Sequence, residues 1–321
     1  MDLHRGARIW HDGQVVRMII NSRSLALVAL AVLALTGCAT QPAESDDKIV
    51  AVGAENQYTS VIAQIGGRYV DASSVMSNPN TDPHTFEASA QIAGTISSAS
   101  LVVQNGLGYD SFMDKIEAAS SGTNRTVISA QKVLGLPDST RNPHLWYSPK
   151  TMPAVGKAIS AALAKLAPKH AEYFATNLAT FDRSLSTWTS AIATFKAAHP
   201  SVAVATTEPV ADYLLEAAGT RNLTPWPLQA AIMNDTDPAP QDVAIQDSLL
   251  TGHRVKVFLY NEQVTDSITA KYLALAKANH VPVVGVYETM PTDGFTYQTW
   301  MEAEFAAVDR AIDTGKSTVK L

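Results

Sequence analysis

The first part of the chain alternates short apolar runs with segments of helical periodicity. Continuous apolar runs a few residues long are typical of strands that are buried on both faces of a parallel sheet. Such runs predict strands at 48–53, 69–76, 101–104 and 125–129. The periodic segments between them predict helices at 58–65, 88–99 and 109–119. This alternation predicts an α/β lobe whose helices cover both faces of the sheet.

A long helical segment follows, because Ala, Leu, Lys and Phe recur at helical spacing from residue 149 to about 199. Pro168 is expected to divide it, since proline lacks the backbone N–H that a helix interior requires. We therefore predict a first helix that ends near residue 166 and a long one over 169–198.

Beyond residue 199 the alternation of strand and helix resumes. It predicts strands at 202–205, 255–260 and 281–286, and helices at 210–218, 267–279 and 297–312. The proline-containing segment 222–240 is expected to be loop-rich. The predicted fold class is α/β, with two lobes that each contain a mainly parallel sheet flanked by helices. The expected boundaries are 48–168 for the N-terminal lobe, 169–198 for the linking helix and 199–321 for the C-terminal lobe.

The N-terminal segment has the pattern of an export signal. Residues 25–35 form an apolar run that is too short to span a bilayer comfortably and is typical of a signal-peptide core. The run ends in Leu35-Thr36-Gly37-Cys38, which resembles a bacterial lipobox, and Cys38 is the only cysteine. We expect residues 1–37 to be removed, Cys38 to be lipidated, and 38–47 to form a flexible tether. The alternatives are an ordinary signal peptide with a chance cysteine, and a true start at Met18.

Composition and charge exclude some classes of protein. The chain has 321 residues, of which 46% are hydrophobic and 17% charged, as expected of a globular protein. Residues 1–37 contain four of the 24 basic and two of the 30 acidic residues, so the remainder carries 20 basic and 28 acidic ones, a net charge of −8. An acidic chain without basic runs is a poor candidate for binding nucleic acid. A single cysteine also excludes an intrachain disulfide.

Four side chains with metal-binding atoms lie in predicted loops, two in each lobe. His84 and His144 each follow a proline, in Asn80-Thr81-Asp82-Pro83-His84 and Asn142-Pro143-His144, and proline stiffens such a loop. Glu208 and Glu288 each follow a predicted strand of the second lobe. Because parallel α/β sheets bind ligands at the carboxyl ends of their strands, these residues predict a site for zinc, manganese or iron(II). Taken singly, each could instead be an ordinary loop histidine or a solvated carboxylate.

The remaining histidines show no partner pattern. His4 and His11 lie in the segment that is expected to be removed. The other four are expected to be structural or solvated: His170, His199, His253 and His280.

The stretches around the candidate ligands resemble the substrate-binding lipoproteins of zinc and manganese ABC importers, the TroA/ZnuA-like family. The resemblance covers residues 48 to about 314. It rests on Asp82-Pro83-His84 with Glu87, Val102-Val103-Gln104-Asn105-Gly106-Leu107-Gly108, Asn142-Pro143-His144-Leu145-Trp146, Glu208 with Tyr213, and Leu259-Tyr260-Asn261-Glu262-Gln263.

The resemblance implies two lobes joined by one rigid helix, with the metal held between them. It implies that His84 and His144 are ligands and that Glu208 is the third. Glu288 is the nearest match to the fourth, where the family usually has an aspartate, and Asp293 is a possible substitute. The chain lacks the histidine-rich loop of many zinc-specific members, and Glu208 stands where those members often have histidine. The expected cargo is zinc by a narrow margin over manganese.

The expected role is capture without catalysis, by a monomer anchored through Cys38 and facing the periplasm or the cell exterior. The loaded protein would deliver Zn(II) or Mn(II) to an ABC permease. A metallohydrolase is an alternative, but it requires an open coordination position and a general base, and no His-Glu-x-x-His motif is present. A siderophore- or cobalamin-binding protein would require a cleft rich in arginine or aromatic residues, and the candidate loops contain few. An adhesin role has no support in the sequence.

Overall fold

The N-terminal lobe is built on a parallel sheet with the strand order β2-β1-β3-β4. The computed structural model describes residues 48–78, 86, 89–119, 124–291 and 294–321, so Cys38, His84 and Asp293 lie outside the described residues. The strands are β1 (Ile49–Glu55), β2 (Val70–Met76), β3 (Leu101–Gln104) and β4 (Thr126–Ser129). All three strand pairs are parallel, and every residue of β3 is buried, as the continuous apolar run predicts.

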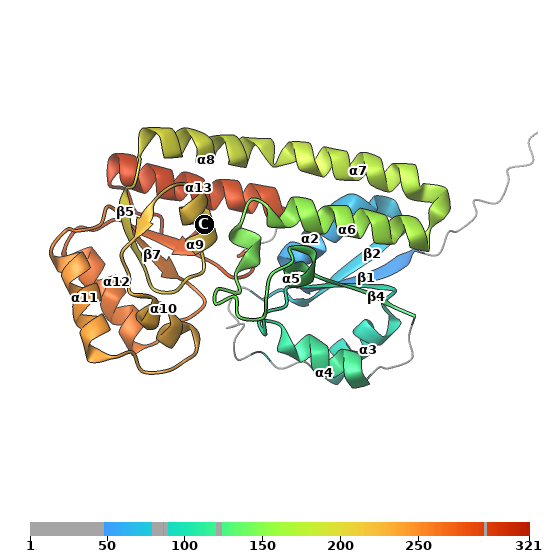
Figure 1. Ribbon diagram of the computed structural model, residues 1–321, viewed down its shortest axis with the longest axis horizontal. Coiled ribbons are helices and arrows are strands. Elements are labelled where there is room, and N and C mark those ends of the chain that lie inside the picture. Colours follow the sequence, from blue (N-terminus) through green and yellow to red (C-terminus); the bar gives the residue numbers. More distant parts are fainter. Residues whose placement is uncertain (1–47, 79–85, 87–88, 120–123, 292–293) are drawn as a thin grey trace, which may run out of the picture. The chain divides into compact units, whose positions relative to one another are not determined.

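Helices cover both faces of this sheet (Figure 1). One face carries α3 (Ala90–Ser98) and α4 (Ser111–Ala119), which pack on Val52 and Val102. The opposite face carries α2 (Asn56–Gly66) and α6 (Thr151–Leu166), which pack on Ala51 and Val103. Short helical segments complete the lobe: a 3-10 turn at Gly67–Tyr69, α5 (Ala130–Val133) and a 3-10 turn at Leu145–Tyr147.

The C-terminal lobe repeats the architecture with the parallel strand order β6-β5-β7-β8. The strands are β5 (Ala203–Thr206), β6 (Arg221–Asn222), β7 (Phe258–Asn261) and β8 (Val283–Val286). One face packs against α10 (Trp226–Met233), α11 (Pro240–Thr251) and α12 (Ser267–Ala278), and the other against α9 (Asp212–Ala217) and α13 (Tyr297–Thr314). Two parallel-sheet lobes confirm the predicted fold class.

The segment 222–240 is not the loop that its prolines predict, because it contains the end of β6 and all of α10. The prolines mark helix starts instead. Pro225 is the N-cap of α10 and Pro227 lies in its first turn, while Pro240 is the first residue of α11. A proline in the first turn of a helix removes a backbone N–H that has no intrahelical partner anyway, so it favours the helix start.

A helical path over residues 171–198 joins the lobes, as predicted, but it is interrupted once. It consists of α7 (Ala171–Ser184) and α8 (Ser186–Ala198), preceded by a 3-10 turn at Pro168–His170. Leu185 between them keeps right-handed helical angles, with φ −75° and ψ −10°. The Ser184 hydroxyl donates to the Phe181 carbonyl at 2.7 Å, and the Thr189 hydroxyl to the Leu185 carbonyl at 3.1 Å. Such hydroxyls compete with backbone amides for helix carbonyls, which accounts for the irregular turn.

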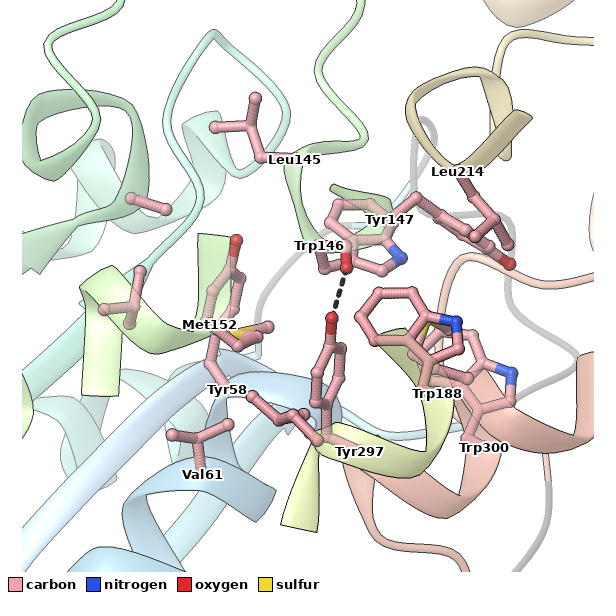
Figure 2. Packing of buried hydrophobic residues seen from close by; sticks show 14 of the residues in the cluster. Tyr58, Val61, Leu145, Trp146, Tyr147, Met152, Trp188, Leu214, Tyr297 and Trp300 are labelled. Carbon is pink, nitrogen blue, oxygen red and sulfur yellow. Dashed lines mark hydrogen bonds between the residues drawn. The ribbon is translucent and has the colours of Figure 1, made fainter. Parts of the chain in front are cut away.

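The linking helices pack against both lobes, which share one hydrophobic core. The α7 helix contacts α2 and α6, whereas α8 contacts α13 (Figure 1). Figure 2 shows Trp188 of α8 beside Trp146 and the α13 residues Tyr297 and Trp300. The Tyr297 hydroxyl donates to the Trp146 carbonyl at 2.6 Å. No helix among the described residues is long and apolar enough to cross a membrane.

Candidate metal site

Three of the four predicted ligands are described, and all three are buried. His144 directly precedes the turn Leu145–Tyr147, Glu208 lies two residues beyond β5, and Glu288 lies two residues beyond β8. Their exposed fractions are 0%, 2% and 0%. Carboxylates this deeply buried require hydrogen-bond donors or a cation, because burial without compensation costs several kcal/mol, roughly.

The orientation of His144 is fixed by Asn142, two residues before it. Asn142 Oδ1 lies 2.7 Å from His144 Nδ1 and 3.0 Å from the His144 backbone nitrogen. The Asn142 amide nitrogen donates to the Pro209 carbonyl at 2.8 Å, which identifies Oδ1 as the oxygen. An amide oxygen only accepts, so Nδ1 carries the proton. Nε2 is therefore the atom that could bind a metal, the arrangement expected of a metal-binding histidine.

His144 Nε2 points at the carboxylate of Glu288. The distance from Nε2 to Glu288 Oε2 is 3.3 Å. The same oxygen accepts from the Tyr109 hydroxyl at 2.9 Å. Burial and the neighbouring Glu288 carboxylate raise the pKa of the Tyr109 phenol well above its usual value, so Tyr109 remains a donor. His144 and Glu288, 144 residues apart, thus meet at one point between the lobes.

Glu208 and Glu288 are joined by one amide group. Asn261 Nδ2 lies 3.0 Å from Glu208 Oε1 and 2.8 Å from Glu288 Oε1. Asn261 is the last residue of β7, the strand between β5 and β8, so its side chain lies between the loops that follow those two strands. The amide supplies partial positive charge where two buried carboxylates converge.

The loop that carries Glu288 is held from within its own lobe by Gln263. Gln263 Oε1 accepts from the backbone N–H groups of Glu288 at 2.6 Å and Thr289 at 2.9 Å. Gln263 Nε2 donates to the Thr289 hydroxyl at 3.0 Å. These bonds fix the backbone from which the Glu288 carboxylate projects.

The same loop is also held by the other lobe, through the start of α2. Asn56 donates from Nδ2 to the Met290 carbonyl at 3.1 Å and accepts from the Met290 N–H at 2.9 Å. Gln57 Nε2 donates to the Glu288 carbonyl at 3.2 Å. The position of Glu288 therefore depends on both lobes.

Two further buried acids lie close to this point. Burial raises the pKa of Asp110 to about 7, although the N–H groups of Asn105 and Gly106 lower it. Burial of the Glu55 carboxyl raises its pKa well above the usual value, and the nearby carboxylates of Asp110 and Glu288 raise it further. No lysine or arginine among the described residues pairs with Glu55 or Asp110. Two buried carboxyl groups without a described basic partner therefore make the space beside Glu288 favourable for a cation.

The three predicted ligands that the structure describes are not arranged around one point. Their ligand atoms do not form a group lying within 4.8 Å of one another among the described residues, whereas those of His199, Asp309 and Asp313 do. Because the Asn261 amide occupies the space between the two carboxylates, a metal requires a rearrangement there. His199 Nε2 contacts Asp313 at 3.0 Å, an ion pair between the end of α8 and α13. His170 stacks on Tyr69 with ring centroids 3.7 Å apart.

Five residues that orient the predicted ligands were not predicted from the sequence. These are Asn142, Tyr109, Asn261, Gln263 and Asn56. Asn261 ends a strand, so the same rule that selected Glu208 and Glu288 could have found it. Asn142 lies two residues before His144, so its contact is local. Tyr109, Gln263 and Asn56 act across long sequence separations that no local pattern shows.

Comparison with known proteins places these observations in a family. The profile described as "ZnuA: Zinc-uptake complex component A periplasmic" matches residues 52–311. "Manganese-binding lipoprotein MntA" of Bacillus subtilis is 30% identical over 170 residues, which cover 50% of this chain and 55% of that protein. "Zinc-binding protein TroA" of Treponema pallidum is 25% identical over 151 residues, 46% of this chain and 49% of that protein. The chain thus spans about half the length of the curated relatives it matches.

Solved structures share the fold. The "periplasmic zinc binding protein TroA from Treponema pallidum" superposes with a TM-score of 0.71 at 17% identity, covering 83% of this chain and 99% of that one. A Mn-bound periplasmic metal-binding protein from Candidatus Liberibacter asiaticus gives a TM-score of 0.68 at 17% identity, covering 83% and 100%. At this identity the likeness shows the fold alone.

Proposed function

Since this chain belongs to the ZnuA family of periplasmic zinc-uptake components, we propose that it captures Zn(II) or Mn(II) between its lobes for import. The proposed ligands are His84, His144, Glu208 and Glu288. The cargo, the ligand set and the partner are parts of this proposal.

The observation that carries the proposal is the meeting of His144 and Glu288. Nε2 and Oε2 lie 3.3 Å apart, both side chains are buried, and Asn142 presents the metal-binding nitrogen. Imidazole and carboxylate suit zinc, manganese and iron(II). Two carboxylates also balance the charge of a divalent ion, which lowers the free-energy cost of burying it.

Capture requires the chain to exchange one set of contacts for another. Glu208 and Glu288 share the Asn261 amide, and we expect the metal to take over its role as the positive partner. Asn142 keeps His144 oriented during the exchange, and Gln263 keeps the Glu288 backbone in place. The His144 ring and the Glu288 backbone are thus held before the ion arrives, while the two carboxylates move to meet it.

Calorimetric titration of ligand variants tests the proposal. His144→Ala, Glu208→Ala and His84→Ala should each lower Zn(II) and Mn(II) affinity by more than the ~10–100-fold typical of groups that only orient a ligand. His280→Ala, a matched change at the end of α12, should leave affinity unchanged. Wild-type affinity in all three ligand variants would overturn the proposal.

The identity of the fourth metal ligand is tested by comparing variants of Glu288 and Asp293. Glu288→Ala should weaken binding as strongly as His144→Ala, because its carboxylate lies beside Nε2. Asp293→Ala should then have little effect. The opposite result would transfer the fourth position to Asp293.

The cargo is proposed to be zinc, narrowly ahead of manganese. The Irving–Williams order predicts tighter binding of zinc than of manganese at almost any N/O site, so affinity alone does not identify the cargo. Growth of an importer-deficient cell under separate zinc and manganese starvation does. Rescue under manganese starvation alone would reverse the preference, and rescue under neither would overturn the import proposal.

Delivery to an ABC permease and attachment through Cys38 complete the proposal. The motif Leu35-Thr36-Gly37-Cys38 supports lipidation, and the relative MntA is named a lipoprotein. Intact-mass analysis of membrane-fraction protein should show an acylated N-terminus at Cys38. An unmodified product that starts elsewhere would contradict the anchor.

A metallohydrolase is the alternative that the metal-binding residues also allow. It would require a metal-bound water and a general base. All four proposed ligands are used for binding, and the members that the comparisons name are metal-binding proteins. Hydrolysis of test esters or phosphates by the zinc-loaded protein, lost in His144→Ala, would favour the alternative.

A further inference from the structure

A second cavity lies beside the metal site, between residues of the two lobes. Its volume is about 360 Å³, within the roughly 300–1,000 Å³ range of small-molecule sites. The first lobe contributes Leu107, Tyr109, Arg141 and Pro143, and α10 of the second lobe contributes Trp226 and Met233. In Figure 1, α10 lies on the side of the C-terminal lobe away from α7 and α8.

One lining residue of the cavity, the exposed Arg141, is a cation. The Arg141 guanidinium carbon lies 6.0 Å from the centre of the Trp226 ring. Within the described part of the chain, Arg141 makes no hydrogen bond and no carboxylate lies within ion-pair distance of it. A guanidinium has five N–H donors and no acceptor, and its planar geometry matches a carboxylate. An anion is therefore the ligand that Arg141 suits best.

Most of the other lining residues are apolar or aromatic, and Asn234 adds a polar amide. Leu107, Pro143 and Met233 offer hydrocarbon surface, and Trp226 offers a half-exposed ring. A flat organic body could cover these groups while its charge meets Arg141. Inorganic anions would leave this surface uncovered.

The cavity adjoins the metal site through two residues. Tyr109 lines the cavity, and its hydroxyl donates to Glu288 Oε2 at 2.9 Å. Pro143, also in the lining, directly precedes His144. A ligand here would thus lie next to the metal site without using any of its proposed ligands.

We propose that this cavity is a second binding site, which takes a small organic carboxylate with a planar or apolar body. Arg141 holds the carboxylate in charge-assisted hydrogen bonds, and Trp226 with the hydrocarbon side chains covers the body. Carboxylate chelators of divalent metals belong to this chemical class. The binding itself does not depend on the proposed metal transport.

Benzoate is a suitable probe, because it is planar, carries one carboxylate and chelates metals poorly. The protein would be freed of metal on a chelating resin and titrated with benzoate by calorimetry or ligand-observed NMR. We expect saturable 1:1 binding. Benzamide has nearly the same shape without the charge and should bind at least about tenfold more weakly, the scale of a lost charge-assisted hydrogen bond.

Variants of the cavity residues distinguish benzoate binding at this site from nonspecific binding of benzoate elsewhere on the protein. Arg141→Gln should weaken benzoate binding by about tenfold or more, and Trp226→Leu should weaken it as well. Arg254→Gln changes another exposed arginine and should have no effect. Thermal unfolding would confirm that each variant folds. Absence of saturable binding to folded wild type, or equal binding by Arg141→Gln, would overturn the proposal.

The same variants distinguish this proposal from the proposed function. Arg141→Gln should bind Zn(II) and Mn(II) like wild type, since Arg141 contacts none of the three proposed ligands that the structure describes. Benzoate binding without metal binding would refute only the transport proposal. Metal binding without benzoate binding would refute only the second site.

Discussion

The Nε2 atom of His144 lies 3.3 Å from Oε2 of Glu288, and solvent reaches neither side chain. A lone pair on His144 Nε2 and one on Glu288 Oε2 would repel each other in a buried place, so we expect a proton between these two atoms when no metal is bound. The Nδ1 proton of His144 is already engaged by Asn142. The proton between His144 and Glu288 must leave when a metal takes its place.

Metal binding should therefore release protons at neutral pH. We expect about one proton per metal from this pair, because a metal ligand must be deprotonated. Titration in buffers that differ in ionisation enthalpy measures the number. Glu288→Gln, which removes the acidic partner, should reduce it. A binding heat that is the same in every buffer would contradict the shared proton.

Asn142 should matter for affinity although it does not touch the metal. Asn142→Ala frees the His144 ring and should lower metal affinity by about 10–100-fold, the usual effect of losing a group that orients a metal ligand. Tyr213→Phe is the control, because the Tyr213 hydroxyl donates to the Asn142 carbonyl at 2.9 Å without contacting His144. Calorimetry should show the loss in the first variant only. Equal losses in both would point to lobe contacts as the cause.

The stability of the metal-free protein should fall as pH rises through neutrality, in part because of Glu304. Burial raises its pKa to about 8, although hydrogen bonds from Tyr147, Trp300 and the Tyr287 N–H lower it. The geometry agrees, because the Tyr147 oxygen lies 2.7 Å from the Tyr287 carbonyl and 2.6 Å from Glu304 Oε2. Both acceptors share the single Tyr147 proton, so this hydrogen bond compensates only part of the cost of burying an ionised Glu304.

The direction of this pH dependence follows from the numbers of protons bound by the native and the unfolded protein. Between the unfolded pKa of 4.5 and the folded value of about 8, the native state holds a proton that the unfolded chain has released. The free energy of unfolding therefore decreases with pH across this window. Glu304→Gln should be more stable than wild type at pH 9, by on the order of a few kcal/mol, and similar near pH 4.5. Urea unfolding at several pH values measures this difference, and a pH-independent difference would contradict it.

The lobes should move little when metal binds. The helical path of α7 and α8, the shared aromatic core and the bonds between Asn56 and Met290 all join them. Domain closure needs a few residues that absorb large backbone changes, which a helix does poorly. Small-angle scattering should show nearly the same radius of gyration with and without metal. Marked compaction would indicate a hinged binder instead.

The sequence predicted the layers of the fold better than the surroundings of the site. Buried strands such as β3 leave continuous apolar runs, so seven of the eight described strands were predicted. The two-residue strand β6 was missed. The α10 helix was missed because Pro225 and Pro227 suggest a loop until they are seen at a helix start. The linking helix was found, but not its irregular turn at Leu185.

Within the candidate site, the residue types that could bind a metal could be predicted from the sequence, but the contacts that orient their side chains could not. His144, Glu208 and Glu288 have residue types and loop positions that suggest a metal. Glu55 was overlooked because β1 runs directly into α2, with no loop to mark the strand end. The contacts of Asn261 with two carboxylates join residues 53 and 27 positions apart. Such pairings are fixed by the sheet order, which no local pattern contains.

The paired hydrogen bonds between Asn56 and Met290 bear on how this chain could be exchanged or divided. The backbone beside Glu288 completes its hydrogen bonding with an amide from the opposite lobe. A C-terminal lobe transplanted onto a relative without that amide would contain every proposed metal-binding residue of its half of the site. The loop that carries Glu288 would, however, lose the contacts that hold it in place. We therefore expect an exchange of lobes between relatives to preserve the site only when both lobes are exchanged together.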